Sequence, residues 1–106
     1  MSWFRRLAWI AGVAALCSCA AGSPKPHAGL AAAWQDYTAM SEERAIAIAG
    51  HPARKRWVTG ASGGHRSAEA AEQAALEHCQ VRRQARRMQE DCVIYAVGDE
   101  IVWRGR

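Results

Sequence analysis

Residues 67–79 read Ser-Ala-Glu-Ala-Ala-Glu-Gln-Ala-Ala-Leu-Glu-His-Cys, and this stretch decides the fold. Ser67 is a favourable N-cap, and Glu69 and Glu72 lie near the start, where the positive end of a helix favours acidic side chains. The alanine-rich run that follows predicts the main helix of the chain. Its apolar face, with Leu76 beside it, consists of small side chains that imply close approach to a sheet: Ala68, Ala71, Ala75 and Cys79.

Beyond Cys79 the apolar stripe of this helix changes direction. A second stripe is rotated by more than about 90° from the first and consists of Val81, Ala85 and Met88. Arg82 and Arg86 stand where the first stripe would continue. We therefore expect the helix to bend, end or leave the core near Cys79.

Two strand-like pieces precede the helix. Ile46 and Ile48 alternate with alanines over residues 45–49, which favours a strand with one large-residue face and one close-packed face. Glu42 and Glu43 leave a helix start as the alternative. Residues 56–60 are strand-like again, so the two pieces predict a hairpin. The glycines that follow match neither phosphate-loop pattern and are interpreted as a loop or a bulge and turn: Gly60, Gly63 and Gly64.

A second hairpin follows the helix, with strands over 92–97 and 100–103 around a Gly98-Asp99 turn. Residues 30–40 place four side chains at helical spacing and predict a short amphipathic helix that packs on the domain: Leu30, Ala33, Trp34 and Tyr37. A partner-binding aromatic face is the alternative for Trp34 and Tyr37. The expected fold is α+β, a small antiparallel ββαββ sheet packed by one main helix, with a short N-terminal helix.

Residues 1–18 have the zones of an export signal, with Arg5-Arg6 ahead of an apolar segment over 7–16. This segment is too short to span a bilayer, which takes about 20 residues. The ending Leu16-Cys17-Ser18-Cys19 resembles the bacterial lipobox, although Cys17 is an uncommon residue at its position. The resemblance implies acylation of Cys19. An ordinary secreted protein, cut near Ala20 or Ala21, is the alternative.

The rest of the chain divides into a flexible tether over residues 19–29, rich in glycine and proline, and one small domain over 30–106. Ala20 follows the lipobox where inner-membrane lipoproteins of well-studied Gram-negative bacteria carry aspartate. By that resemblance we expect anchoring to the outer membrane, facing the periplasm, with inner-membrane anchoring or secretion as alternatives.

Export places Cys79 and Cys92 in an oxidising space, where they are the two thiols left once Cys17 is removed and Cys19 acylated. A disulfide between them is the natural pairing. A straight helix from Cys79 to Glu90 would advance about 16 Å, whereas bonded cysteines need Cα atoms within about 7 Å. The bond therefore predicts a helix that ends before Gln89. Adjacent residues on a helix diverge, so His78 and Cys79 make a poor metal or nucleophile site.

From residue 44 onward the chain resembles a family of small exported bacterial domains of unknown function. The resemblance rests on five short pieces: Ala45–Ala49, Trp57–Gly60, Ser67–Ala71, Ala75–Cys79 and Cys92–Val97. It implies the ββαββ order, the disulfide and no known catalytic residues. This chain departs from the pattern by a basic insert over residues 82–87.

Composition and motifs favour a non-catalytic protein-binding module of the envelope, an assembly component or an inhibitor, without metal or cofactor. The formal charge of +4 falls by two when Arg5 and Arg6 leave with the signal, which is weak support for a polyanion partner. A surface of anionic lipid or lipopolysaccharide is the alternative partner, bound through two basic clusters: Arg54, Lys55, Arg56, Arg82, Arg83, Arg86 and Arg87. Nucleic acid is not expected. An enzyme would have to use His51, His65, His78 and scattered carboxylates, which lack motif spacing.

Overall fold

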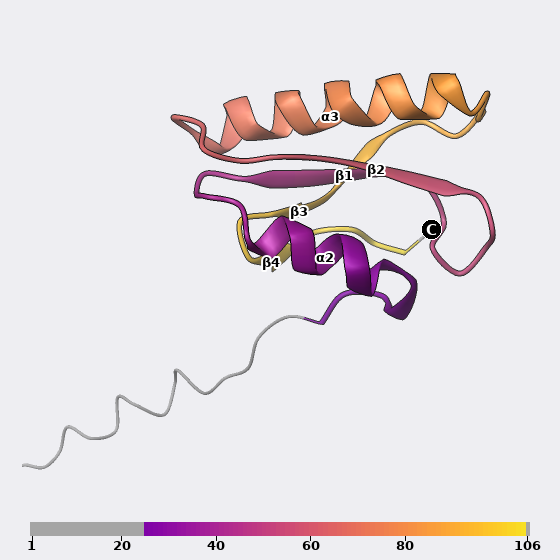
Figure 1. Cartoon of the computed structure of the whole chain (residues 1–106), viewed down its shortest axis with the longest axis horizontal. Helices are drawn as coiled ribbons and strands as arrows, with labels where there is room; N and C mark the ends of the chain where they lie inside the picture. Colours follow the sequence, from indigo (N-terminus) through magenta and orange to yellow (C-terminus); the bar gives the residue numbers. More distant parts are fainter. Residues whose placement is uncertain (1–24, 106) are drawn as a thin grey trace, which may run out of the picture.

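The computed structural model describes residues 25–105; the expected signal peptide, the acylated Cys19 and the tether up to residue 24 lie outside them. The described chain forms η3 (Ala28–Leu30), α2 (Ala31–Thr38), β1 (Ala45–Gly50), β2 (Trp57–Ser62), α3 (Ala68–Ala85), β3 (Val93–Val97) and β4 (Glu100–Ile101) (Figure 1). The strands form one antiparallel sheet in the order β2-β1-β3-β4. This confirms the small α+β fold with two hairpins, one main helix and a short helix before the sheet.

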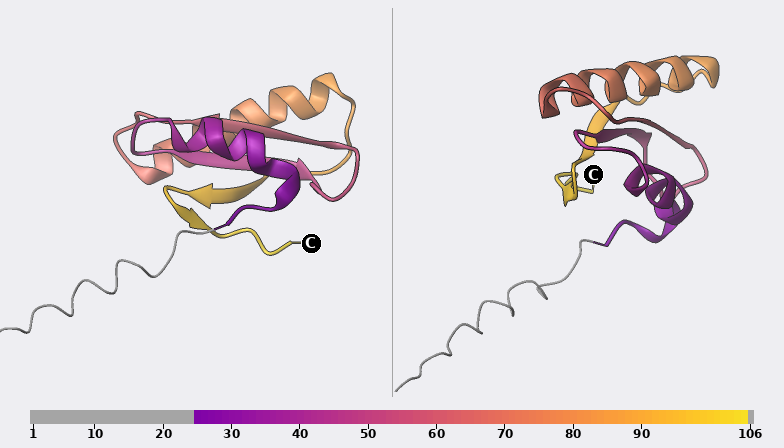
Figure 2. Two further views of the ribbon diagram at one scale, coloured as in Figure 1. Left: turned by 60° about the horizontal axis from the view of Figure 1, so that its bottom comes forward. Right: turned by 60° about the vertical axis from the view of Figure 1, so that its left-hand side comes forward.

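The alternating sequence of β1 separates the core into two layers. Its alanines face α3 and pack in one buried cluster, which includes Ala45, Ala47, Ala49, Ala71, Ala75 and Cys79. Its isoleucines face the opposite side and pack in a second cluster with Leu30, Tyr37 and Tyr95. Figure 2 shows α2 and α3 on opposite faces of the sheet. The large-residue and close-packed faces predicted for this strand are therefore confirmed.

The main helix leaves the core at Cys79, as the change of stripe predicted. At the start of α3, the side chain of Ser67 accepts a hydrogen bond from the backbone N–H of Ala70. The last buried residue of α3 is Cys79. Val81 is 68% exposed. The helix stops at Ala85, and the Cys79–Cys92 disulfide is present with its Cα atoms 6.1 Å apart. The pairing and the helix end before Gln89 are both confirmed.

Gly60 lies inside strand β2, which confirms the strand predicted over 56–60, whereas the loop or turn suggested for Gly60, together with the next two glycines, was wrong for Gly60. The strand continues to Ser62 and pairs with β1 along its whole length. A Cβ atom added at Gly60 would lie 2.7 Å from the carbonyl oxygen of Ala75 and 2.8 Å from the Cα of Cys79. Only glycine lets the backbone of α3 approach the strand this closely, which is a tertiary requirement that local turn rules do not contain.

The second hairpin is shorter than the sequence predicted. Its last strand ends at Ile101, because the backbone N–H groups of Val102 and Trp103 turn to the carbonyl oxygen of Tyr95, at 2.9 and 3.1 Å. The register of β3 against β1 also shifts, from Ile46 paired with Ala96 to Ala47 paired with Ile94. Tyr95 is thus the extra residue of a β-bulge.

Tyr37 holds α2 to the second hairpin. Its hydroxyl donates to the carbonyl oxygen of Gly98 at 2.7 Å. Burial raises the pKa of Tyr37 to about 12, so the phenol stays protonated and remains a donor. Arg44 lies 5.3 Å from the centre of this ring and forms an ion pair with Asp99. The contacts fix the Gly98-Asp99 turn beneath the helix.

The residues just before α2 contact the domain. The backbone N–H of His27 donates to the hydroxyl of Tyr95 at 2.9 Å, and Leu30 is buried. Residues 27–29, which the sequence placed in the tether, therefore lie against the sheet.

Candidate functional site

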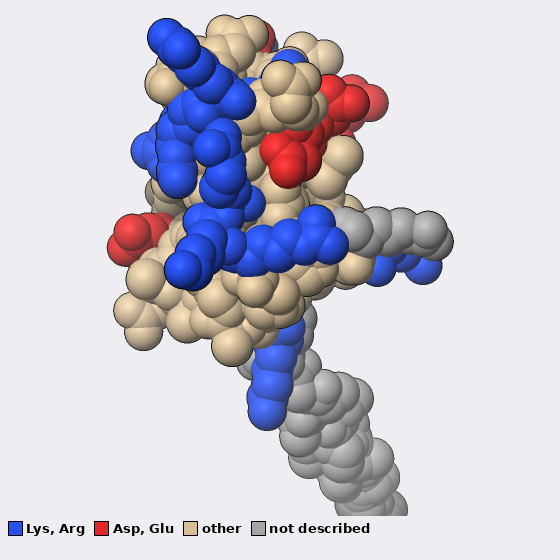
Figure 3. Space-filling view, turned by 90° about the vertical axis from the view of Figure 1, so that its right-hand side faces the viewer, with Lys and Arg blue, Asp and Glu red and all other residues tan. Residues whose placement is uncertain are grey.

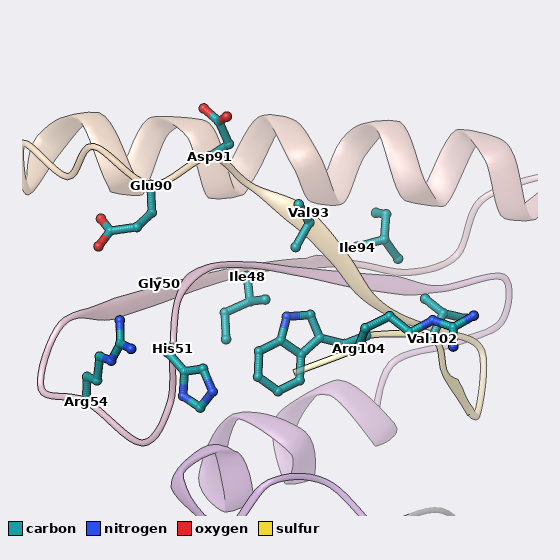
Figure 4. A pocket seen from close by; sticks show the side chains of 11 residues that line it. Ile48, Gly50, His51, Arg54, Glu90, Asp91, Val93, Ile94, Val102 and Arg104 are labelled. Atoms are coloured by element: carbon teal, nitrogen blue, oxygen red, sulfur yellow. The ribbon is translucent and has the colours of Figure 1, made fainter. Parts of the chain in front are cut away.

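A cleft of about 590 Å³ opens between β1 and β3, and we call it the β1–β3 cleft. Strand β1 continues to Gly50, but its pairing with β3 ends at Ile48 opposite Val93. The chain before Val93 leaves the sheet because Cys92 is bonded to Cys79 on α3. Figure 4 shows this segment rising from Val93 toward Asp91, with the cleft below it. The disulfide thus separates the two strands and creates the opening.

The floor of the β1–β3 cleft is apolar. It is formed by Ile48, Val93, Ile94, Val102 and Trp103. Two of these side chains are unusually open for large apolar residues, because Val93 is 47% and Val102 41% exposed. Cavities of this size with apolar walls and a few polar groups are the usual form of binding sites.

A row of aromatic rings leads from α2 to this floor. Trp34 lies 6.1 Å from Tyr95, Tyr95 lies 5.4 Å from Trp103, and Trp103 lies 5.1 Å from His51, between ring centres. Tyr37 adjoins the row, with its ring centre 5.2 Å from that of Trp34, so both residues pack in the domain as the amphipathic pattern favoured. The row fixes Trp103 at the edge of the cleft.

The lips of the β1–β3 cleft carry opposite charges. Glu90 and Asp91 come from the chain between α3 and β3, whereas His51 and Arg54 come from the β1–β2 connection. Arg104 adds a second guanidinium from the C-terminal segment. Figure 4 shows Glu90 and Arg54 extending toward the mouth from opposite sides. The cleft therefore presents anionic and cationic groups around an apolar floor.

The two basic clusters predicted from the sequence come together at one end of the domain. Arg56 donates to the carbonyl oxygen of Arg86 at 2.8 Å, across 30 residues of sequence. A second cavity, of about 530 Å³, is lined by Lys55, Arg82 and Arg86 among others. Figure 3 shows a band of Lys and Arg side chains on this face. We call these residues the basic end: Arg54, Lys55, Arg56, Arg82, Arg83, Arg86 and Arg87.

Several arginines of the basic end bind backbone carbonyl oxygens. Arg82 donates to Thr59 at 3.2 Å and Arg86 to Trp57 at 3.4 Å, both on β2. Arg83 donates to the carbonyl of Met88 at 2.9 Å, beyond the end of α3. Cations at a helix C-terminus also interact favourably with the helix dipole. The basic insert therefore has a structural role, and its outward-facing charge is additional to it.

The histidines do not meet at one site. The rings of His27 and His51 lie 5.8 Å apart, and the Nδ1 atom of each accepts a nearby backbone N–H. His65 contacts Ser62 instead, with 2.7 Å between Nε2 and Oγ, and His78 is exposed on α3. Within residues 25–105, no cluster of three His, Cys, Asp or Glu side chains has metal-site geometry.

The Ser62–His65 pair was not found from the sequence. A hydroxyl against an imidazole is the beginning of a nucleophilic site, which further needs an orienting group and a substrate cavity. Neither side chain lines the β1–β3 cleft or the cavity at the basic end, and within the described chain no carboxylate is bonded to His65. We assign the pair to the structure of the β2–α3 loop. The spacing Ser-x-x-His after a strand is the signal that could have indicated it.

No family model, curated protein or solved structure matches this chain. The resemblances to the lipobox and to a family of small exported domains therefore stay predictions. No helix within residues 25–105 is long and apolar enough to cross a membrane. The functional interpretation rests on the residues and geometry described above.

The β1–β3 cleft itself escaped the sequence analysis. Of the residues around it, Arg54 and His51 were considered, but for polyanion contact and for catalysis. Val93, Val102 and Trp103 were interpreted only as strand residues. The cleft arises from the combination of a disulfide, a bulge and an early end of β3 pairing, and no local pattern encodes that combination.

Proposed function

We propose that the protein is a lipoprotein, acylated at Cys19, whose domain is a non-catalytic protein-binding module of the cell envelope. The observation that carries this proposal is the β1–β3 cleft, whose apolar floor is open and whose lips are charged. The Cys79–Cys92 bond supports export, since disulfides persist in oxidising compartments. Outer-membrane anchoring with the domain in the periplasm follows from the residues after Cys19, and the module serves as an assembly component or an inhibitor there.

The anchor is tested by the intact mass of protein extracted from its native membrane. We expect the mass of residues 19–106 plus acyl groups, with two cysteines that alkylate only after reduction. Cys19→Ser should move the protein from the membrane to the soluble fraction, because more than one acyl chain gives stable anchoring. Cys17→Ser is the matched control and should leave acylation unchanged. Soluble, unacylated wild-type protein would contradict the anchor.

The binding role is tested by cross-linking in intact cells followed by affinity purification of the full chain. A module of this kind should recover one envelope protein in a constant ratio to itself. Recovery of no protein above the level of an unrelated lipoprotein, under several cross-linker lengths, would count against the proposal.

A second candidate function, binding of an anionic lipid or lipopolysaccharide surface, is supported by the convergence at the basic end. Lys55 and Arg87 donate no side-chain hydrogen bond within the described residues, so their charges remain available to phosphate groups. Basic residues near an anionic membrane contribute about 1 kcal/mol each. Arg66 lies at the start of α3, roughly 27 Å from the basic end along an 18-residue helix, and provides a distant comparison.

This candidate predicts salt-sensitive binding to vesicles that contain phosphatidylglycerol or lipopolysaccharide. The Cys19→Ser protein should be used, so that acyl chains do not contribute. Lys55→Glu and Arg87→Glu should each weaken co-sedimentation by about fivefold or more, whereas Arg66→Glu, with the same change in net charge, should have a smaller effect. Equal effects of the three substitutions, or binding that salt does not weaken, would exclude a role of this surface.

A further inference from the structure

One residue of the central strand is left without a strand partner inside the β1–β3 cleft. Ala49 pairs with Val58 of β2 and is fully buried, whereas Gly50 pairs with Trp57 of β2, lines the cleft and has no partner on β3. Within residues 25–105 no backbone hydrogen bond joins Gly50 to the C-terminal segment either. An unpaired strand edge is a template for an extended chain, which adds main-chain hydrogen bonds to the sheet.

The side chains around this edge suit the alternating faces of an extended peptide. Val93 and Val102 leave apolar surface open on the floor, and Trp103 borders it. In an extended peptide, successive side chains point to opposite faces. Every second residue of an inserted segment would therefore meet this apolar floor, and the residues between them would face away from it.

The charges at the mouth favour an occupant that carries both signs. Glu90 and Asp91 lie on the lip near α3, and Arg54 lies across the mouth from Glu90, whereas Arg104 lies at the other end of the cleft beside Val102 (Figure 4). The structure contains one ion pair within residues 25–105, between Arg44 and Asp99, so these lips are not neutralised by one another. Complementary charges give specificity and fix the register of a bound chain.

We propose that the β1–β3 cleft binds an extended peptide segment of the partner protein, alongside the unpaired edge at Gly50. The segment carries apolar side chains at alternate positions, a basic residue facing Glu90 and Asp91, and an acidic residue or terminal carboxylate facing Arg54. This inference rests on the proposed function and adds the site and the form of the bound partner.

The test is selection of random octapeptides displayed on phage, against the purified full-length protein with its disulfide intact. Enriched peptides should share alternating apolar positions and residues of both charges. Synthetic copies should bind the wild-type protein, and Val93→Asp should weaken them at least about tenfold, because a carboxylate in an apolar contact is left without a partner. Val81→Asp is the matched control on exposed α3 surface, and binding there should change by less than about twofold.

A charge exchange tests the orientation. Glu90→Lys should weaken the enriched peptides, and exchange of their basic residue for an acidic one should restore the binding. A library without a shared pattern, or peptides that bind the Val93→Asp protein as well as wild type, would overturn the inference. A dimer that dissociates on Val93→Asp would overturn it as well, since a second copy of the chain would then occupy the cleft.

The outcomes separate this inference from the proposed function. If an envelope partner is cross-linked equally by wild-type and Val93→Asp protein, the binding module stands and the peptide site is wrong. If peptides bind the cleft but no partner is recovered from cells, the site stands and the envelope role is wrong.

Discussion

Gly60→Ala is expected to destabilise the domain by at least about 3 kcal/mol, at the upper end of overpacking effects. The new methyl group would meet backbone atoms of α3 at Ala75 and Cys79 rather than the flexible end of a side chain. The helix cannot slide away at this point, because Cys79 is bonded to Cys92 at the start of β3. The strain therefore has to displace a covalently fixed part of the core.

Urea denaturation followed by tryptophan fluorescence would measure this loss. Gly64→Ala is the comparison, since a Cβ atom added at Gly64 meets nothing within 4 Å. This substitution destabilises the domain only because alanine must adopt the positive φ of 79° found at Gly64. We expect this destabilisation to be about 1 kcal/mol. If the two substitutions had equal effects, the close approach of α3 to β2 would not be the reason for glycine at residue 60.

Loss of the disulfide is expected to reduce the free energy of unfolding by about 3 kcal/mol in the chain-entropy model. The two cysteines are 13 residues apart in the sequence. The whole free energy of unfolding of a single domain is only about 5–15 kcal/mol. The Cys79→Ala/Cys92→Ala protein and the reduced wild-type protein should therefore unfold at clearly lower urea concentrations than the oxidised protein. Reductant should not change the double variant further.

The same variants report on the cleft. Without the bond, the segment that carries Glu90 and Asp91 is no longer held near α3, so the lip of the β1–β3 cleft loses its fixed position. Peptides selected on the oxidised protein should bind the Cys79→Ala/Cys92→Ala protein more weakly. Binding is measured without urea, where this variant is still folded. Unchanged stability after reduction would show that the packing of Cys79, and not the covalent bond, holds the helix end.

The sequence was most informative where a local pattern or a covalent limit favoured one arrangement. Ile46 and Ile48 between alanines favoured a strand with two unlike faces over a helix, and the structure has these faces. The distance limit on a Cys79–Cys92 bond excluded a long helix, and α3 ends at Ala85. In both cases a local pattern or a covalent limit was sufficient, because neither depends on how distant elements pack.

Other features depended on contacts between distant segments. Gly60 was assigned both to the end of a strand and to a glycine loop, because the reason for glycine there lies in the backbone of α3. The bulge at Tyr95 and the turn of Val102 and Trp103 toward its carbonyl depend on where the C-terminal segment lies. The Ser62–His65 contact and the convergence of the two basic clusters likewise follow from the path of the chain. These required the three-dimensional arrangement.

The arginines at the end of α3 that bind β2 also bear on solubility. Strand β2 is one of the two edge strands of the sheet, and an exposed edge strand can pair with another copy of the chain and start aggregation. Arg82 and Arg86 occupy the carbonyls of Thr59 and Trp57 and place positive charge along the same edge. Two molecules that approach each other through β2 are repelled by these positive charges. The carbonyl oxygens of Thr59 and Trp57 also already accept hydrogen bonds and are less available for a second sheet. Pairing of two copies of the chain through β2 is therefore disfavoured.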